Sequence, residues 1–242
     1  MSNPTPTRSR TDLSRRSFVT GAAWSAPIIA VAAASPLAAA SATCTQDAQI
    51  SWSSTFTATD TQNGSGSFQT PSGEVVNYTV TVLTGVNIEV PATSDNLNTT
   101  GDGIFLGDRQ LVAAATKEFD GTYTQTTTVT FDQPIESIRF RVFDVDGSEF
   151  YREHLRVTGL PGVVATPGNR VELEPVSGTY RPTEDLPIGP VIAGSVSYAA
   201  SGPTSSFTVE LTTPRTAVPP QGVLSHGVRM TNLTYAAACA TA

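Results

Sequence analysis

The sequence predicts an all-β fold, an antiparallel β-sandwich of jelly-roll-like form, preceded by a helical N-terminal signal segment. Apolar and polar residues alternate with a period of two over most of the chain after residue 44, as in strands with one buried face. Glycine and proline interrupt these runs at short intervals, and 36 threonines suit the pleated, half-buried surfaces of strands. About ten such strands without helices between them favour a sandwich.

Each predicted strand follows from its own alternation. Near the start, Ile50, Trp52 and Phe56 alternate with serine and threonine, which places Trp52 in the core. Four threonines face one side of a later strand while Val129 and Phe131 face the other. The remaining runs lie, in order, at 76–82, 138–142, 155–157, 171–173, 191–198, 207–211 and 228–235. Loop-rich stretches are predicted at 91–108 and 177–190, and one or two helical turns at 111–119.

The first forty residues are similar to a twin-arginine export signal. Arg15 and Arg16 are followed by Phe18 in an S-R-R-S-F motif, and an alanine-rich stretch ends in small residues. We predict cleavage near residue 40 or 42, which divides the chain into a signal at 1–42 and a single domain at 43–242. An uncleaved membrane anchor is the alternative, although threonine, serine and proline interrupt the weakly apolar stretch. The expected location is therefore secreted or at the cell surface, with membrane contact only during export.

Charge and composition exclude several classes of protein. The net charge is −7, and residues 1–40 carry four arginines and one aspartate, so the remainder carries −10. Such an acidic domain lacks the basic stripe that nucleic acids and anionic membranes require. Two histidines and two cysteines are too few for a zinc site built within one chain.

The two cysteines, Cys44 and Cys239, stand at opposite ends of the predicted domain. In an exported protein an even number of cysteines favours a disulfide, and this one requires the first and last strands to be neighbours. Acylation of Cys44 in a lipoprotein is the alternative, but the residues before it suit that modification poorly.

Two segments carry a resemblance to known extracellular modules. The stretch 128–147 (TVTFDQPIESIRFRVFDVDG) resembles a hairpin of bacterial surface proteins, with a turn at its proline and a D-x-D end. The stretch 226–235 (HGVRMTNLTY) resembles the last strand of jelly-roll modules in adhesins and carbohydrate-binding proteins. The resemblance implies an adhesin-like module of the cell surface or extracellular space.

The candidate metal ligands are carboxylates near the end of the stretch 128–147. Asp144 and Asp146 occupy alternate positions, and Glu149 follows in the adjoining loop. Oxygen ligands of this kind suit Ca²⁺, with Asp102 or Asp108 available to complete a site. The spacing does not match an EF-hand, and aspartates that cap a turn are the alternative. No other cofactor is expected.

Catalytic patterns are scarce. No G-x-S-x-G motif occurs, and only His154 and His226 could act as imidazole bases. Glycoside hydrolysis requires two nearby carboxylates, and Glu172 and Glu174 share a strand face, although such pairs commonly just face water. No catalytic residue is predicted, and a secreted hydrolase remains the last alternative.

The predicted function is a non-enzymatic binding or structural module whose partner is a cell-surface glycan or protein. The second alternative is a carbohydrate-binding module, with Tyr151 and Tyr180, together with Phe150, as a stacking platform in loops and strand ends. The ligand and the oligomeric state do not follow from the sequence.

Overall fold

The structure is a computed structural model that describes residues 45–84, 96–101, 103–111, 122–148, 151–184, 194–214 and 223–238. The backbone divides into two units, Met1–Thr43 and Cys44–Ala242, and every described residue belongs to the second. The predicted signal residues Arg15, Arg16 and Phe18 therefore lie outside the described residues. No helix in the described ranges has the length and apolar character needed to cross a membrane.

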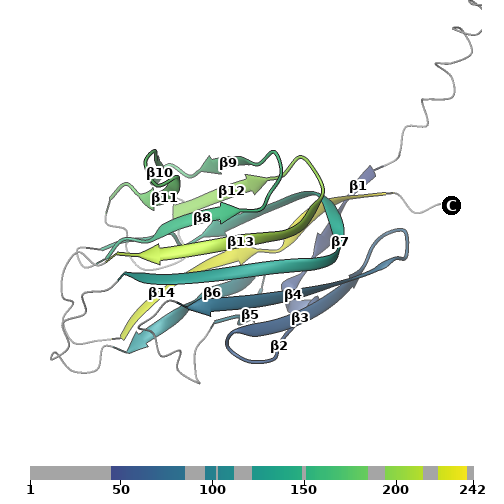
Figure 1. Cartoon of the computed structure of the whole chain (residues 1–242), viewed down its shortest axis with the longest axis horizontal. Helices are drawn as coiled ribbons and strands as arrows, with labels where there is room; N and C mark the ends of the chain where they lie inside the picture. The colour runs from purple at the N-terminus through teal and green to yellow at the C-terminus, as the bar shows by residue number, and fades with distance from the viewer. Residues whose placement is uncertain are drawn as a thin grey trace, which may run out of the picture. The chain divides into compact units, whose positions relative to one another are not determined.

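The second unit is an antiparallel β-sandwich of two sheets, which confirms the predicted fold class (Figure 1). Sheet B runs in the order β2, β3, β4, β7, β13, β8, β11 and β10. Its strands other than β7 span Phe56–Ala58 (β2), Asn63–Gln69 (β3), Val75–Thr84 (β4), Thr204–Thr213 (β13), His154–Thr158 (β8), Thr179–Pro182 (β11) and Val171–Glu174 (β10).

Sheet A is built around the second half of β7 (Tyr123–Phe143). On one side β7 pairs with β12, which pairs in turn with β9; on the other side it pairs with β14 and β15. Beyond these, β6 pairs with β14, β1 with β15, and β5 with β6. These strands span Ser195–Ala199 (β12), Val164–Pro167 (β9), Val223–Thr231 (β14), Leu233–Ala238 (β15), Gly103–Leu111 (β6), Thr45–Ile50 (β1) and Thr99–Thr100 (β5).

The long strand β7 joins the two sheets. Its first half, residues 123–131, pairs with β4 and β13 in sheet B, whereas residues 136–143 pair within sheet A. The hairpin expected at Gln133-Pro134 is therefore wrong, because the two halves pair with different strands and not with each other. The register with β13 shifts across this region and Ser137 has a φ of +50°. An irregularity of this kind bends a strand, which lets β7 cross from one sheet to the other.

The core lies between the sheets and follows the predicted alternation. On β4, Val76, Tyr78, Val80 and Val82 are buried while the residues between them are exposed. Aromatic rings connect the two sheets: the Phe140 ring of sheet A stacks on Phe207 of sheet B with centroids 5.0 Å apart, and Phe68 meets Tyr235 at 5.4 Å. Burial of these apolar faces is the main favourable contribution to folding.

Trp52 is fully buried, as predicted, but it begins a four-residue helix, α2 (Trp52–Thr55), and not part of a strand. Its indole Nε1–H donates to the carbonyl of Thr231 at 2.8 Å, and its backbone N–H donates to Asn232 Oδ1 at 3.0 Å. Both partners follow it by about 180 residues, so the local sequence could not reveal this turn.

The first and last described strands are neighbours, as the predicted disulfide requires. β1 pairs with β15 over six residues, from Ile50 opposite Leu233 to Thr45 opposite Ala238. Cys44 and Cys239 are the next residues in sequence beyond that last pair, and both lie outside the described residues. Their disulfide therefore remains a prediction.

Candidate functional site

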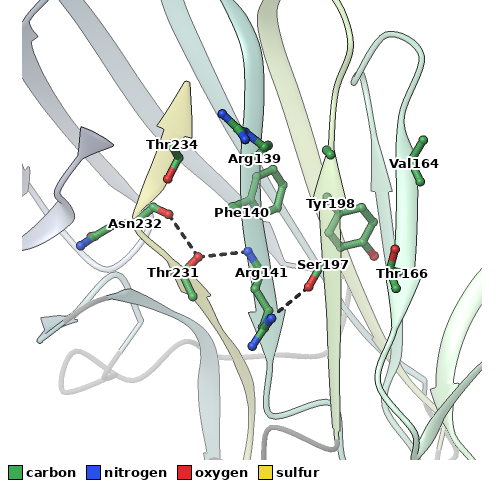
Figure 2. A pocket seen from close by; sticks show the side chains of 11 residues that line it. Arg139, Phe140, Arg141, Val164, Thr166, Ser197, Tyr198, Thr231, Asn232 and Thr234 are labelled. Atoms are coloured by element: carbon green, nitrogen blue, oxygen red, sulfur yellow. Dashed lines mark hydrogen bonds between the residues drawn. The ribbon is translucent and has the colours of Figure 1, made fainter. Parts of the chain in front are cut away.

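The outer face of sheet A is hollowed where β9, β12, β7 and the β14–β15 junction lie side by side (Figure 2). The hollow has a volume of about 420 Å³, and a second hollow of about 310 Å³ shares Arg141, Thr166 and Ser197 with it. We call the two together the groove. The other lining residues with outward polar side chains are Arg139, Asn169, Thr231, Asn232 and Thr234.

Strand register explains the groove. Thr166 of β9 lies opposite Ser197 of β12, and Ser197 lies opposite Arg141 of β7. Since side chains of paired residues project from the same face, these three form one row across the sheet. Serine, threonine and the nearby Ala199 are small, so they leave space on either side of the long arginine side chain.

Arg141 is fixed at the centre of the groove. Its Nε–H donates to Ser197 Oγ at 3.0 Å, and its backbone N–H donates to Thr231 Oγ1 at 3.0 Å (Figure 2). The Thr231 hydroxyl donates in turn to the carbonyl of Asn232 at 3.1 Å. Within the described part of the chain, the guanidinium makes no ion pair and no other hydrogen bond. Its two terminal nitrogens therefore remain available to a ligand.

Arg139 is also exposed and lies two residues earlier on the same face, yet its charge is neutralised. Its Nη2 forms an ion pair with Asp47 Oδ1 on β1, and the two guanidinium groups point in opposite directions (Figure 2). Arg141 is thus an open cationic group on a domain whose net charge is strongly negative.

A second polar cluster lies at the end of β7 and contains the predicted metal ligands Asp144 and Asp146. Glu153, which is 1% exposed, accepts the backbone N–H of Asp146 at 3.0 Å and that of Gly227 at 3.1 Å. The Tyr151 hydroxyl donates to Asp146 Oδ1 at 3.1 Å. One carboxylate therefore joins the end of β7 to Gly227 of β14, which lies 74 residues beyond Glu153.

The three carboxyl groups of this cluster are hard to ionise together. Burial, followed by the charge of Asp144, raises the pKa of Asp146 to about 7. Burial, followed by the charge of Asp146, raises the pKa of Glu153 well above its usual range. Burial also raises the pKa of Asp144, although the charge of Arg229 opposes this. A carboxyl pair of this kind retains a proton near neutral pH.

The described residues do not include a complete set of ligands for the predicted calcium site. Within the described ranges, no three His, Cys, Asp or Glu side chains are grouped so that they could hold a metal ion. Glu149 and Asp102 lie outside the described residues, and the side chain of Asp108 is not described. Calcium therefore remains a prediction for Asp144, Asp146 and Glu149.

No family model matches the chain, and no curated protein matches it. The function of the groove and of the polar cluster at the end of β7 is therefore inferred from their geometry.

Glu172 and Glu174 form an ion-pair network with Arg181 on the β10–β11 hairpin. Arg181 Nη2 lies 3.1 Å from Glu172 Oε1, and Arg181 Nη1 lies 2.9 Å from Glu174 Oε1. A hydrogen bond from Ser177, opposed in part by desolvation, lowers the pKa of Glu174. Burial lowers the pKa of His154, whose Nδ1 is 4.0 Å from Glu174. A general acid needs a raised pKa, so this arrangement does not favour glycoside hydrolysis. The side chain of His226 is not described.

The predicted stacking platform is not present among the described aromatic residues. Tyr151 is 1% exposed, so burial leaves it no open face against which a sugar could stack. Tyr180 is half-buried and meets the buried ring of Tyr198 edge-on at 6.3 Å. Phe150 lies outside the described residues.

Sequence reasoning missed two groups that the structure brings together. The signal for the groove was the pair of arginines at alternate positions, Arg139 and Arg141, on the outer face of a strand in an acidic domain. Nothing in the sequence distinguished Glu153 from an exposed loop glutamate, because the N–H groups that it accepts come from Asp146 and Gly227.

The raised pKa of the Asp146 carboxyl predicts that the stability of the domain depends on pH. Its folded pKa of about 7 exceeds the ordinary value of 3.8, so the folded state holds a proton that the unfolded chain has released. The stabilisation is therefore complete below about pH 4 and is lost as the pH rises through about 7. Between about pH 5 and pH 8 we expect Tm to fall by several degrees in metal-free buffer, and to fall less in Asp146→Asn. Calorimetry at both pH values tests this, with exposed Asp132→Asn as the control; an equal fall in Asp146→Asn contradicts it.

Proposed function

We propose that the protein is an exported, non-enzymatic binding module of the cell surface or extracellular space, adhesin-like in kind, whose ligand occupies the groove of sheet A. The observation that carries this proposal is the open guanidinium of Arg141 in a groove lined by hydroxyl and amide groups. A concave polar surface with a cationic group that has no ion-pair partner among the described residues is suited to a ligand from outside.

Export is supported by the N-terminal motif. The paired arginines Arg15 and Arg16, with Phe18 and the alanine-rich stretch after them, are typical of twin-arginine signals. An antiparallel sandwich whose first and last described strands are neighbours suits a protein in which a disulfide joins the two ends of the domain outside the cell.

A secreted hydrolase is less well supported. Glu172 and Glu174 pair with Arg181 on the β10–β11 hairpin, and Asp146 and Glu153 lie buried near the end of β7. A binding role needs none of these groups.

The proposal is tested with the full chain, expressed in a host that has the twin-arginine pathway and recovered from outside the cytoplasm. Binding is measured on a glycan array and on a panel of extracellular matrix proteins. We expect Ala199→Trp, which fills the groove, to abolish binding, and Ser206→Trp, on the exposed outer face of sheet B, to preserve it. Absence of the protein outside the cytoplasm, absence of any ligand, or equal binding by both variants contradicts the proposal.

A further inference from the structure

The groove offers hydrogen bonds and charge but no aromatic platform. Of the described residues that line it, Phe140 and Tyr198 are aromatic, and they are 5% and 3% exposed because their rings pack into the core. A ligand therefore cannot stack on an exposed ring here. Its contacts are with hydroxyl groups on four strands, from Thr166, Ser197, Thr231 and Thr234, and with the amides of Asn169 and Asn232.

Hydroxyl and amide contacts alone give little affinity, because each replaces a hydrogen bond to water of similar strength. Charge-assisted hydrogen bonds are about twice as strong, and a guanidinium can form two in parallel with one planar anion. Ser197 already occupies Nε of Arg141, so the end-on pair, Nη1 and Nη2, remains. The net negative charge of the domain repels anions in general, so an anionic ligand is favoured only where it can pair with a cationic group such as Arg141.

Taking the proposed binding function as its basis, we propose that the groove binds a carboxylate-bearing carbohydrate, a uronic-acid oligosaccharide, whose carboxylate pairs end-on with Arg141. The sugar hydroxyl groups meet Thr166, Ser197 and Thr231. Arg141, Thr166 and Ser197 belong to both hollows of the groove, so an elongated chain places its charged unit at the centre and its neighbours on either side.

An acidic peptide fits the groove less well than a saccharide. Extended peptides commonly bind by adding a strand to an open sheet edge. The two strands under the centre of the groove, β7 and β12, are paired on both sides, so they present no free edge. The exposed apolar side chains of the described lining are Val164 and Pro167, which are too few to form a set of apolar pockets for peptide anchors.

Arg156 supplies a control for the test. It is an exposed arginine on β8 of sheet B and does not line the groove. Tri-galacturonate, alginate oligomers and hyaluronate oligomers are titrated into the exported protein by calorimetry up to millimolar concentrations. Methyl-esterified tri-galacturonate, neutral galacto-oligosaccharide and oligoglutamate are titrated in parallel.

We expect at least one uronate to bind and the esterified and neutral sugars to bind at least tenfold more weakly. Arg141→Ala is expected to weaken binding about tenfold or more, which corresponds to the loss of one charge-assisted pair. Arg141→Lys keeps the charge but loses the forked geometry of the guanidinium, so an intermediate loss of affinity is expected, whereas the affinity of Arg156→Ala stays within about twofold of the wild type. Unchanged Tm values exclude misfolding as the cause. Higher salt should weaken binding of the uronate.

Each contrary outcome overturns the inference in a distinguishable way. Equal affinity for charged and neutral sugars, or unchanged affinity in Arg141→Ala, shows that the ligand class is wrong while the binding function stands. Oligoglutamate that binds as tightly as any uronate shows that the partner is an acidic protein segment. Failure of every uronate, with another array ligand still lost in Ala199→Trp, rejects the uronate alone. If the wild type binds no ligand at all, or if Ala199→Trp binds as well as the wild type, the proposed function is rejected as well.

Discussion

Glu153→Ala is expected to lower the free energy of unfolding by about 2–5 kcal/mol and Tm by about 5–15 °C. The substitution leaves the backbone N–H groups of Asp146 and Gly227 without an acceptor in a region where Glu153 itself is 1% exposed. Each buried donor without a partner costs about 1–3 kcal/mol. Relief of the repulsion between Glu153 and Asp146 offsets part of this loss.

Thermal or urea unfolding of the purified protein measures the effect. Glu153→Gln keeps one acceptor oxygen and removes the repulsion, so it should be clearly more stable than Glu153→Ala. Glu172→Ala serves as the control, because its side chain is half exposed and its ion pair with Arg181 lies on the surface. An alanine variant at residue 153 as stable as the wild type would show that Glu153 does not hold these segments together.

Removal of the predicted Cys44–Cys239 disulfide is expected to cost about 4–5 kcal/mol, because the cross-link closes a loop of nearly the whole domain. The described part of the fold meets the necessary condition, since Thr45 lies opposite Ala238 in the β1–β15 pair. The exported protein should contain no reactive thiol when unfolded without reductant, and its mass should increase by two hydrogens after reduction.

Three variants separate the disulfide from the packing of the cysteine side chains. Cys44→Ser, Cys239→Ser and the double variant should lose the same stability, because each breaks the same bond. The wild type should lose a similar amount in reductant, while the double variant should not respond to reductant. Two free thiols in the native exported protein would rule the disulfide out.

Much of the sandwich could be predicted because burial of one strand face leaves a direct record in the sequence. The alternation of Val76, Tyr78, Val80 and Val82 marked one buried face, and the structure buries all four. The same alternation could not show that β7 continues through Gln133-Pro134 into the other sheet. Locally, a proline after a strand indicates a turn. Only the pairing partners reveal that β7 bends, because its first half pairs with β4 and β13 and its second half with β12 and β15.

The candidate site was less predictable than the fold. Acidic residues at a strand end drew attention to Asp144 and Asp146, whereas the carboxylate with the most demanding environment is Glu153. The aromatic residue Tyr151 looked like a loop residue open to a ligand, but it is buried and bonded to Asp146. Whether a polar side chain in a loop faces water or the interior depends on long-range packing that leaves no periodic pattern.

By itself, the sequence determined the all-β class and the residues that face the core, because period-two alternation is a local property of each strand. The tertiary structure alone decided which outward side chains become neighbours, because strand order and register are set by pairings between distant segments. Arg139 and Arg141 show the difference most directly, since both lie on the outer face of one strand and each is followed by an apolar residue. A partner 92 residues away neutralises Arg139, whereas the register of β12 and β9 surrounds Arg141 with hydroxyl groups and leaves its charge open.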